Sequence, residues 1–267
     1  MRRFAVVLAI AALAAASAIV IASAKTERSP LRVFRITLAG ENENPAGDPV
    51  ATGTAVIRAR AGQARICYQL VVRDLSRRAV AAHIHRGPAK VSGPVLIPLR
   101  TPSAAGTSRG CAKTTKARVR AILAHPRRYY VNVHTAEFPG GAIRAQLAGH
   151  RTVRGTILHL QLKGTSEPNA RGRAVLRLRK NAGLVCYRLH VQNVTLPTVA
   201  AHIHKGAAGV NGPVVVPLTA PGADGTSSGC SAASVSVISD MLANLAGYYV
   251  NVHTKQHPAG AIRAQLR

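Results

Sequence analysis

The sequence repeats its most distinctive segments at an interval of 119 residues. Ala82-His83-Ile84-His85 recurs as Ala201-His202-Ile203-His204, and Tyr129-Tyr130-Val131-Asn132-Val133-His134-Thr135 recurs as Tyr248-Tyr249-Val250-Asn251-Val252-His253-Thr254. Two copies of one pattern in a chain of 267 residues predict two domains with the same fold, and two copies are too few for a solenoid. We place these domains at residues 25–148 and 149–267.

Short runs of alternating apolar residues, separated by glycine and proline, fill both repeats. Phe34, Ile36 and Leu38 form the first run, as expected of a half-buried strand. Seven or eight such runs in about 115 residues predict an all-β fold, either a β-sandwich or a barrel. One segment of each repeat instead has the apolar spacing of a helix, at 116–125 and at about 232–246. We therefore expect two tandem β-sandwich or barrel-like domains, each with one short helix.

Residues 1–24 have the features of a signal peptide. Arg2 and Arg3 precede an uncharged apolar run from Phe4 to Ile21, and Ala22-Ser23-Ala24 matches a small-residue cleavage site before Lys25. The alternative is a retained anchor, because the run is close to the roughly 18 residues that span a bilayer. We expect cleavage, a secreted or extracytoplasmic protein, and no transmembrane segment in the mature chain.

The four cysteines occupy equivalent places in the two repeats. Pairing within each repeat gives the disulfides Cys67–Cys111 and Cys186–Cys230, which suit an exported protein. A loop of this size corresponds to roughly 4 kcal/mol in the chain-entropy model. The competing interpretation is a metal site, although the CxxC spacing typical of such sites is lacking.

The chain is strongly basic, with 36 Lys and Arg against 9 Asp and Glu. A charge of this sign favours anionic partners. Aromatic residues make up only 3% of the chain and a nucleic-acid-binding motif is lacking, which disfavours nucleic acid. An extracellular protein or an anionic envelope polymer is the expected partner, although an Arg-rich composition without a dedicated partner would look the same.

The histidines are the most chemically suggestive residues. In a β-strand, side chains alternate between the two faces, so His83 and His85 share a face, and Tyr130, Asn132 and His134 share a face of their own strand. The second repeat places His202, His204 and His253 in the same way. Three imidazoles that converged would suit a metal such as zinc or copper.

These motifs resemble those of the CHRD domain, a module named for chordin and found in many exported bacterial proteins. The resemblance rests on Gly-x-Asn-Glu-x-Pro, Ala-His-Ile-His followed by Gly-Pro-Val, Tyr-Val-Asn-Val-His-Thr, and Pro-Gly-Gly-x-Ile-Arg-x-Gln-Leu, and it covers nearly all of the mature chain. It implies an all-β extracellular module. In chordin the module belongs to a protein that binds secreted growth factors, and no settled activity is attached to the bacterial members.

The resemblance also marks a set of positions in each repeat. In the first repeat they are Glu43, His83, His85, Gly93, Pro94, Asn132, His134, Gly141 and Arg144. In the second they are Glu167, His202, His204, Gly212, Pro213, Asn251, His253, Gly260 and Arg263. Here Glu167 is taken as the counterpart of Glu43, in a loop shorter by five residues. The second repeat also has Gln256 in place of Glu137.

Two functional hypotheses follow from these observations. The first is a non-catalytic binding or structural module of the cell envelope, in which the histidines are structural and no residue is catalytic. The alternative is a metal-binding protein that uses His83, His85 and His134, and their counterparts, to bind zinc or copper, with metal-dependent activity as an extension. Other catalytic patterns are lacking: the cysteines are expected to be bridged, and neither a Gly-x-Ser-x-Gly elbow nor a Walker lysine is present.

Overall fold

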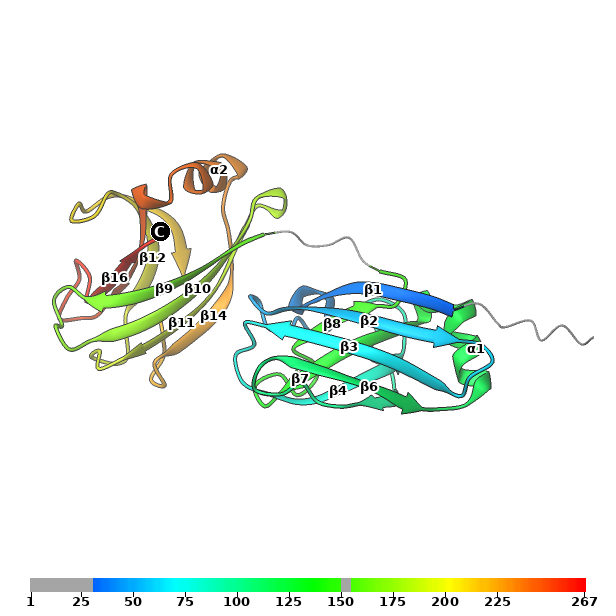
Figure 1. Ribbon diagram of the computed structural model, residues 1–267. Coiled ribbons are helices and arrows are strands. Elements are labelled where there is room, and N and C mark those ends of the chain that lie inside the picture. Colours follow the sequence, from blue (N-terminus) through cyan, green and yellow to red (C-terminus); the bar gives the residue numbers. More distant parts are fainter. Residues whose placement is uncertain (1–30, 150–154) are drawn as a thin grey trace, which may run out of the picture.

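The computed structural model describes residues 31–149 and 155–267, and the expected signal peptide lies outside these ranges. The described residues form two all-β domains of eight strands each (Figure 1). Domain 1 contains β1–β8 and domain 2 contains β9–β16. Both predictions, of an all-β fold and of one short helix in each domain, are confirmed.

The elements of domain 1 follow the predicted runs closely. They are β1 (Leu31–Ala39), the 3-10 turn η1 (Gly40–Asn42), β2 (Thr52–Arg60), β3 (Arg65–Arg73), β4 (Ala79–Arg86), β5 (Val95–Leu99), β6 (Thr107–Lys113), α1 (Lys116–Ala124), η2 (Pro126–Arg128), β7 (Tyr129–Thr135) and β8 (Ile143–Gln146). Strand β6 was not predicted, because it lacks the alternating apolar residues of the other strands.

Domain 2 repeats the order of strands and helix, but its first 3-10 turn follows its second strand instead of its first. Its elements are β9 (Thr156–Gly164), β10 (Arg171–Arg179), η3 (Lys180–Ala182), β11 (Leu184–Gln192), β12 (Ala200–Lys205), β13 (Val214–Leu218), β14 (Thr226–Ala232), α2 (Val235–Ala243), η4 (Leu245–Gly247), β15 (Tyr248–His253) and β16 (Ile262–Gln265). Helix α2 is shorter at both ends than the sequence indicated.

Each domain is a single antiparallel sheet that curls into a nearly closed barrel. The strand order in domain 1 is β5-β4-β7-β8-β1-β2-β3-β6, and domain 2 has the equivalent order. The edge strands β5 and β6 lie beside each other without pairing. Alternate residues of every strand therefore point into one core, as the burial of Phe34, Ile36 and Leu38 in β1 illustrates.

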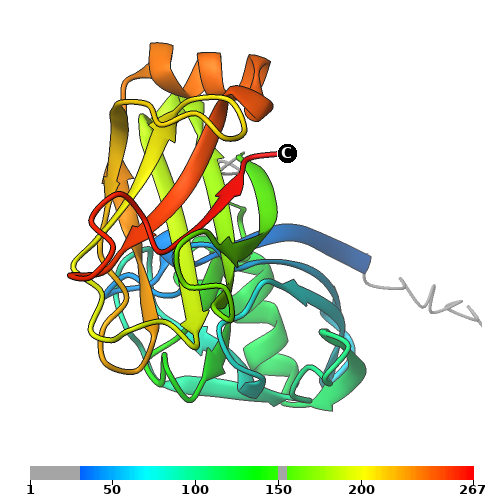
Figure 2. The same cartoon turned by 90° about the vertical axis from the view of Figure 1, so that its left-hand side faces the viewer.

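The two helices pack against their barrels through a few apolar residues. In α1 the buried residues are Val119 and Ile122, and Thr115 caps the helix by accepting a hydrogen bond from the Arg118 N–H. Figure 2, with domain 2 facing the viewer, shows α2 at the end of its barrel away from domain 1. The outer sheet faces thus stay clear of helices.

Both predicted disulfides are present, and each joins two neighbouring strands. Cys67 in β3 lies directly opposite Cys111 in β6, and Cys186 in β11 lies opposite Cys230 in β14. The cysteines alternate with core residues such as Ile66, so they lie on the outer face of the sheet.

Neither helix in the described ranges has the length and apolar character needed to cross a bilayer.

Candidate functional site

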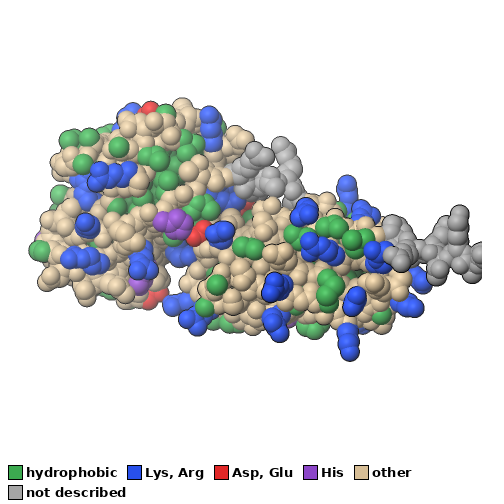
Figure 3. Space-filling model, in the orientation of Figure 1, with side chains coloured by type: hydrophobic (Ala, Val, Ile, Leu, Met, Phe, Trp, Pro, Cys, Tyr) green, Lys and Arg blue, Asp and Glu red, His purple; other side chains and the backbone are tan. Residues whose placement is uncertain are grey.

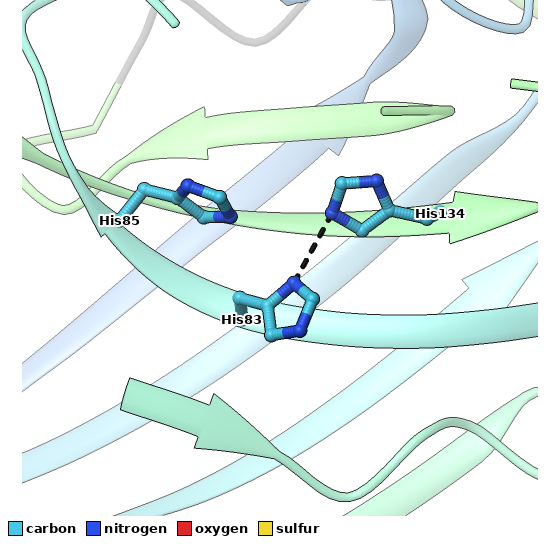
Figure 4. Close-up of side chains that lie close together, drawn as sticks. All are labelled: His83, His85 and His134. Carbon is cyan, nitrogen blue, oxygen red and sulfur yellow. Dashed lines mark hydrogen bonds between the residues drawn. The ribbon is translucent and has the colours of Figure 1, made fainter. Parts of the chain in front are cut away.

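The three histidines of domain 1 meet on the outer face of the barrel. His83 and His85 alternate with the buried Ile84 in β4, and β4 pairs with β7, which carries His134. In that register His134 lies opposite Ala81, diagonally next to His83. The three rings therefore gather over two neighbouring strands (Figure 4).

Nitrogen atoms of the three rings converge. One ring nitrogen from each residue lies within 4.8 Å of the others, both for His83, His85 and His134 and for the counterpart cluster in domain 2. The closest pair in domain 1 is His83 Nδ1 and His134 Nε2, at 3.2 Å. The second cluster comprises His202, His204 and His253 and reproduces this distance at 3.3 Å between His202 Nδ1 and His253 Nε2.

Backbone carbonyls fix the orientation of two rings in each cluster. His85 Nδ1 lies 2.8 Å from the Gly93 oxygen, and His134 Nδ1 lies 2.9 Å from the Pro139 oxygen. A carbonyl oxygen only accepts, so both Nδ1 atoms donate and both Nε2 atoms keep their lone pairs. Domain 2 repeats both bonds, from His204 to Gly212 and from His253 to Pro258.

One nitrogen in each cluster lacks a partner. The Nε2 atoms of His85 and His204 are buried and have no hydrogen-bond partner among the described residues. Each ring is held by stacking, at 4.8 Å from the ring of Tyr130 and 4.9 Å from that of Tyr249. A buried acceptor without a partner costs about 1–3 kcal/mol, and the same arrangement recurs in both domains.

Burial favours the neutral form of five of the clustered histidines. Burial is the largest cause that lowers the pKa of His83, His85 and His134, and neighbouring histidines lower the pKa of the first two further. Burial likewise lowers the pKa of His202 and His253. Neutral imidazole is the form that binds Zn(II), Cu(II) or Ni(II).

A buried carboxyl group lies next to the first cluster. Burial raises the pKa of Glu43 to about 7, against the opposing effects of Arg144, Asn132 and Lys90. The Asn132 side-chain oxygen in turn lies 3.1 Å from His134 Nε2. Gly141 has a φ of +138°, and a Cβ there would lie 2.3 Å from Glu43 Oε1, so the carboxyl group needs glycine at this position.

Among the described residues of domain 2 none takes the place of Glu43, and the prediction that Glu167 is its counterpart is wrong. Glu167 accepts a hydrogen bond from the Thr195 N–H, just as Asp48 accepts one from the Ser76 N–H in domain 1. The five missing loop residues therefore include the position of Glu43 itself. The Asn251 amide lies against Gly260, where Glu43 lies against Gly141 in domain 1.

Sequence reasoning missed the aromatic and cationic support beneath the histidines. The Arg144 guanidinium carbon lies 3.3 Å from the ring centre of Tyr130, and the Arg263 carbon lies 3.7 Å from that of Tyr249. Arg144 also donates to the carbonyl oxygens of Pro88 and Val91, which holds the loop after β4. Strand alternation had placed Tyr130 on the face of His134, and the resemblance had marked Arg144 and Arg263, but neither signal indicated that the guanidinium groups stack on the tyrosine rings.

The geometry defines a class of protein: tandem antiparallel barrels, each with one cross-strand disulfide and a cluster of three histidines on its outer face. The family model of the CHRD domain matches residues 34–147 and 159–266. The chain therefore belongs to the CHRD-domain family, with two copies in tandem. No curated protein and no solved structure gives a significant match to it.

Proposed function

We propose that this chain is an extracytoplasmic, non-catalytic binding module in which each CHRD domain holds one zinc or copper ion on three imidazoles. Residues 1–24 act as a cleaved signal peptide, and the mature domains extend over 25–148 and 149–267. The observation that carries the metal sites is the convergence of one ring nitrogen from each of three histidines within 4.8 Å, repeated in both domains.

The donor set suits a transition-metal ion. The ligand atoms are Nε2 of His85, Nε2 of His134 and Nδ1 of His83, and the first two rings are oriented by carbonyl bonds on their other nitrogen, which is the usual support for metal-binding histidines. Three protein ligands leave a further coordination position open. An outside donor atom at that position would make each domain a binding site.

A purely structural cluster is the competing explanation. In that arrangement His83 Nδ1 donates to His134 Nε2 and holds the two strands together. It leaves His85 Nε2 buried without a partner, and the same deficit recurs in domain 2. A metal ion in each domain would give this nitrogen a partner, which is why we favour metal binding.

Metal content after exposure to zinc or copper and dialysis tests the proposal. The mature, oxidised protein is compared with a His83→Ala/His202→Ala variant and with a control, His125→Ala/His190→Ala, which removes two exposed histidines outside the clusters. We expect about two metal ions per chain in the wild type and the control, one for each cluster, and loss of both in the first variant. A wild type without metal, or retention in the first variant, contradicts the proposal.

A further inference from the structure

In domain 2, the outer face of β9, β10, β11 and β14 binds the acidic end loops of domain 1. Arg177 and Arg179 contact the two carboxylate oxygens of Glu41, at 3.3 and 3.5 Å. Arg188 contacts the buried Asp48 at 2.5 Å, and its guanidinium also donates to a backbone carbonyl of domain 1. This sheet face is therefore a carboxylate-binding surface, and the molecule itself provides the ligand.

Domain 1 has the corresponding face on β1, β2, β3 and β6, and it keeps most of these cations. The repeat offset places Arg58 and Arg60 where domain 2 has Arg177 and Arg179. Arg35 in β1 takes the place of His159, which lies 3.3 Å from Asp74 across the domain boundary. The exception is Arg188, where domain 1 has Gln69.

The face of domain 1 is more basic than its counterpart. Arg65, Arg109 and Lys113 add to it, because each lies an even number of residues from the outward-facing Cys67 or Cys111 on its strand. None of the four strands contains an acidic residue. Figure 3 shows Lys and Arg side chains over the front of domain 1, with acidic ones only beside domain 2.

Four arginines of this surface have no side-chain partner among the described residues. Arg35, Arg58, Arg65 and Arg109 are exposed, and none forms an ion pair or side-chain hydrogen bond within residues 31–149 and 155–267. We call the set the basic sheet face of domain 1 and define it as Arg35, Arg58, Arg60, Arg65, Arg109 and Lys113.

A second copy of the chain does not supply the missing anions. The end of domain 2 that corresponds to the acidic end of domain 1 carries Thr165 in place of Glu41 and Asn193 in place of Asp74. Glu167, which replaces Asp48, is already engaged by Thr195 and Thr254. Asp224 at the same end accepts two hydrogen bonds from Thr226, so head-to-tail stacking of copies would offer the cations fewer free carboxylates than domain 1 offers domain 2.

From these contacts we infer that the basic sheet face of domain 1 is a docking surface for a carboxylate-rich segment of another polypeptide. Arg58 and Arg60 together bind one carboxylate group, as Arg177 and Arg179 bind Glu41. Arg35 binds a second carboxylate group. The inference gives a partner chemistry to the binding role proposed above and rests on that role, but it is independent of the metal sites.

A labelled peptide of about 16 glutamate residues is the probe, and its binding to the full mature chain is followed by fluorescence anisotropy at about 50 mM NaCl, where screening is limited. The variant is Arg35→Gln/Arg58→Gln/Arg109→Gln. The control, Lys163→Gln/Lys180→Gln/Lys255→Gln, removes the same charge from exposed positions of domain 2. We expect the first triple to weaken binding about tenfold and the control less than about twofold.

Three results would overturn the inference. The first is that the peptide does not bind the wild type, and the second is that both triple variants weaken peptide binding equally. The third is that a polyphosphate of matched charge binds more tightly than the peptide, which would make phosphate the preferred anion. Metal content is measured on the same samples. If it is unchanged while peptide binding fails, the docking surface is wrong and the metal sites stand.

Discussion

Glu43 distinguishes the two histidine sites more than any other residue. It is buried next to Asn132 and Gly141 in domain 1, and the loop that carries it is shortened in domain 2. Its pKa is raised to about 7 from 4.5, so the folded state holds its proton up to a higher pH than the unfolded state. Ionisation of Glu43 therefore opposes folding, and stability is lost as pH rises from about 4.5 through about 7.

Replacing Glu43 by glutamine should remove this loss. We expect Glu43→Gln to raise the free energy of unfolding by about 1–3 kcal/mol at pH 8 and to leave it nearly unchanged at pH 4, where both states of the wild type are protonated. Urea unfolding at the two pH values measures the difference. The exposed Glu137→Gln is the control, with little effect expected at either pH. A loss of stability at pH 8 would contradict the argument.

The histidines give a pH dependence of opposite sign. Burial lowers the pKa of His83, His85 and His134 below 6.5, so below that pH the unfolded state takes up more protons and the apoprotein loses stability as pH falls. Bound metal should persist at pH 6.5 and be released only at lower pH, as protons displace it. A chelator-based titration of the metal-loaded protein follows the release, and half-release at or above pH 6.5 would count against the site.

At the scale of elements, the sheet edges show where sequence patterns are informative. Strand β4 and strand β7 were predictable from alternation, and with them the shared face of His83 and His85. Strand β6 was not, because its inward positions are Ser108, Gly110 and Ala112. A Cβ on Gly110 would lie 2.9 Å from the Tyr68 hydroxyl oxygen, so small residues replace the usual apolar ones.

The convergence of the histidines also lay beyond the sequence. Alternation fixes which residues share a strand face, but the β4–β7 register and the two carbonyl bonds that turn the rings are tertiary features. The loop deletion misled in a different way. Gly164 corresponds to Gly40 and Pro168 corresponds to Pro49, so Glu167 aligns with Asp48. Aligning the loop from its amino-terminal end had instead placed Glu167 opposite Glu43.

The two disulfides should differ in their rate of reduction. In the Cys186–Cys230 bridge only Cys230 is exposed, because Cys186 is fully buried beneath the face that domain 1 covers, whereas both cysteines of the Cys67–Cys111 bridge are at least partly exposed. Attack by a thiolate needs access, so limiting reductant should open Cys67–Cys111 first. Differential alkylation with mass spectrometry measures the order. Equal rates, or faster opening of Cys186–Cys230, would show that coverage by domain 1 does not protect the bridge.

At the scale of the whole molecule, the domain contact depends on a few buried charges. Arg177 is 2% exposed and Asp48 is fully buried, so these ions have little solvent to replace a lost partner. Asp48 also accepts from the backbone N–H groups of Val50 and Ala51, which ties the contact to the start of β2. The loops of domain 1 and the sheet of domain 2 therefore hold one another in place.

Removing the arginines of this contact should separate the domains. For Arg177→Gln/Arg179→Gln/Arg188→Gln we expect a larger radius of gyration in small-angle scattering, with metal content unchanged. The matched control is Arg35→Gln/Arg58→Gln/Arg109→Gln, which changes the uncovered face of domain 1 and should leave the radius as in the wild type. An unchanged radius in the first variant would mean that other contacts fix the arrangement.

The contact between the domains joins two different surfaces, an acidic end and a basic sheet face, and this limits how further domains could be added. A unit with the acidic end of domain 1 could be joined ahead of β1, where it would contact the basic sheet face. A unit joined behind β16 would meet Thr165 and Asn193 in place of Glu41 and Asp74. Tandem arrays of these domains could therefore be extended only at the end that precedes β1. Their length would be set by the number of acidic-ended units, and the histidine clusters would recur along them at a fixed spacing.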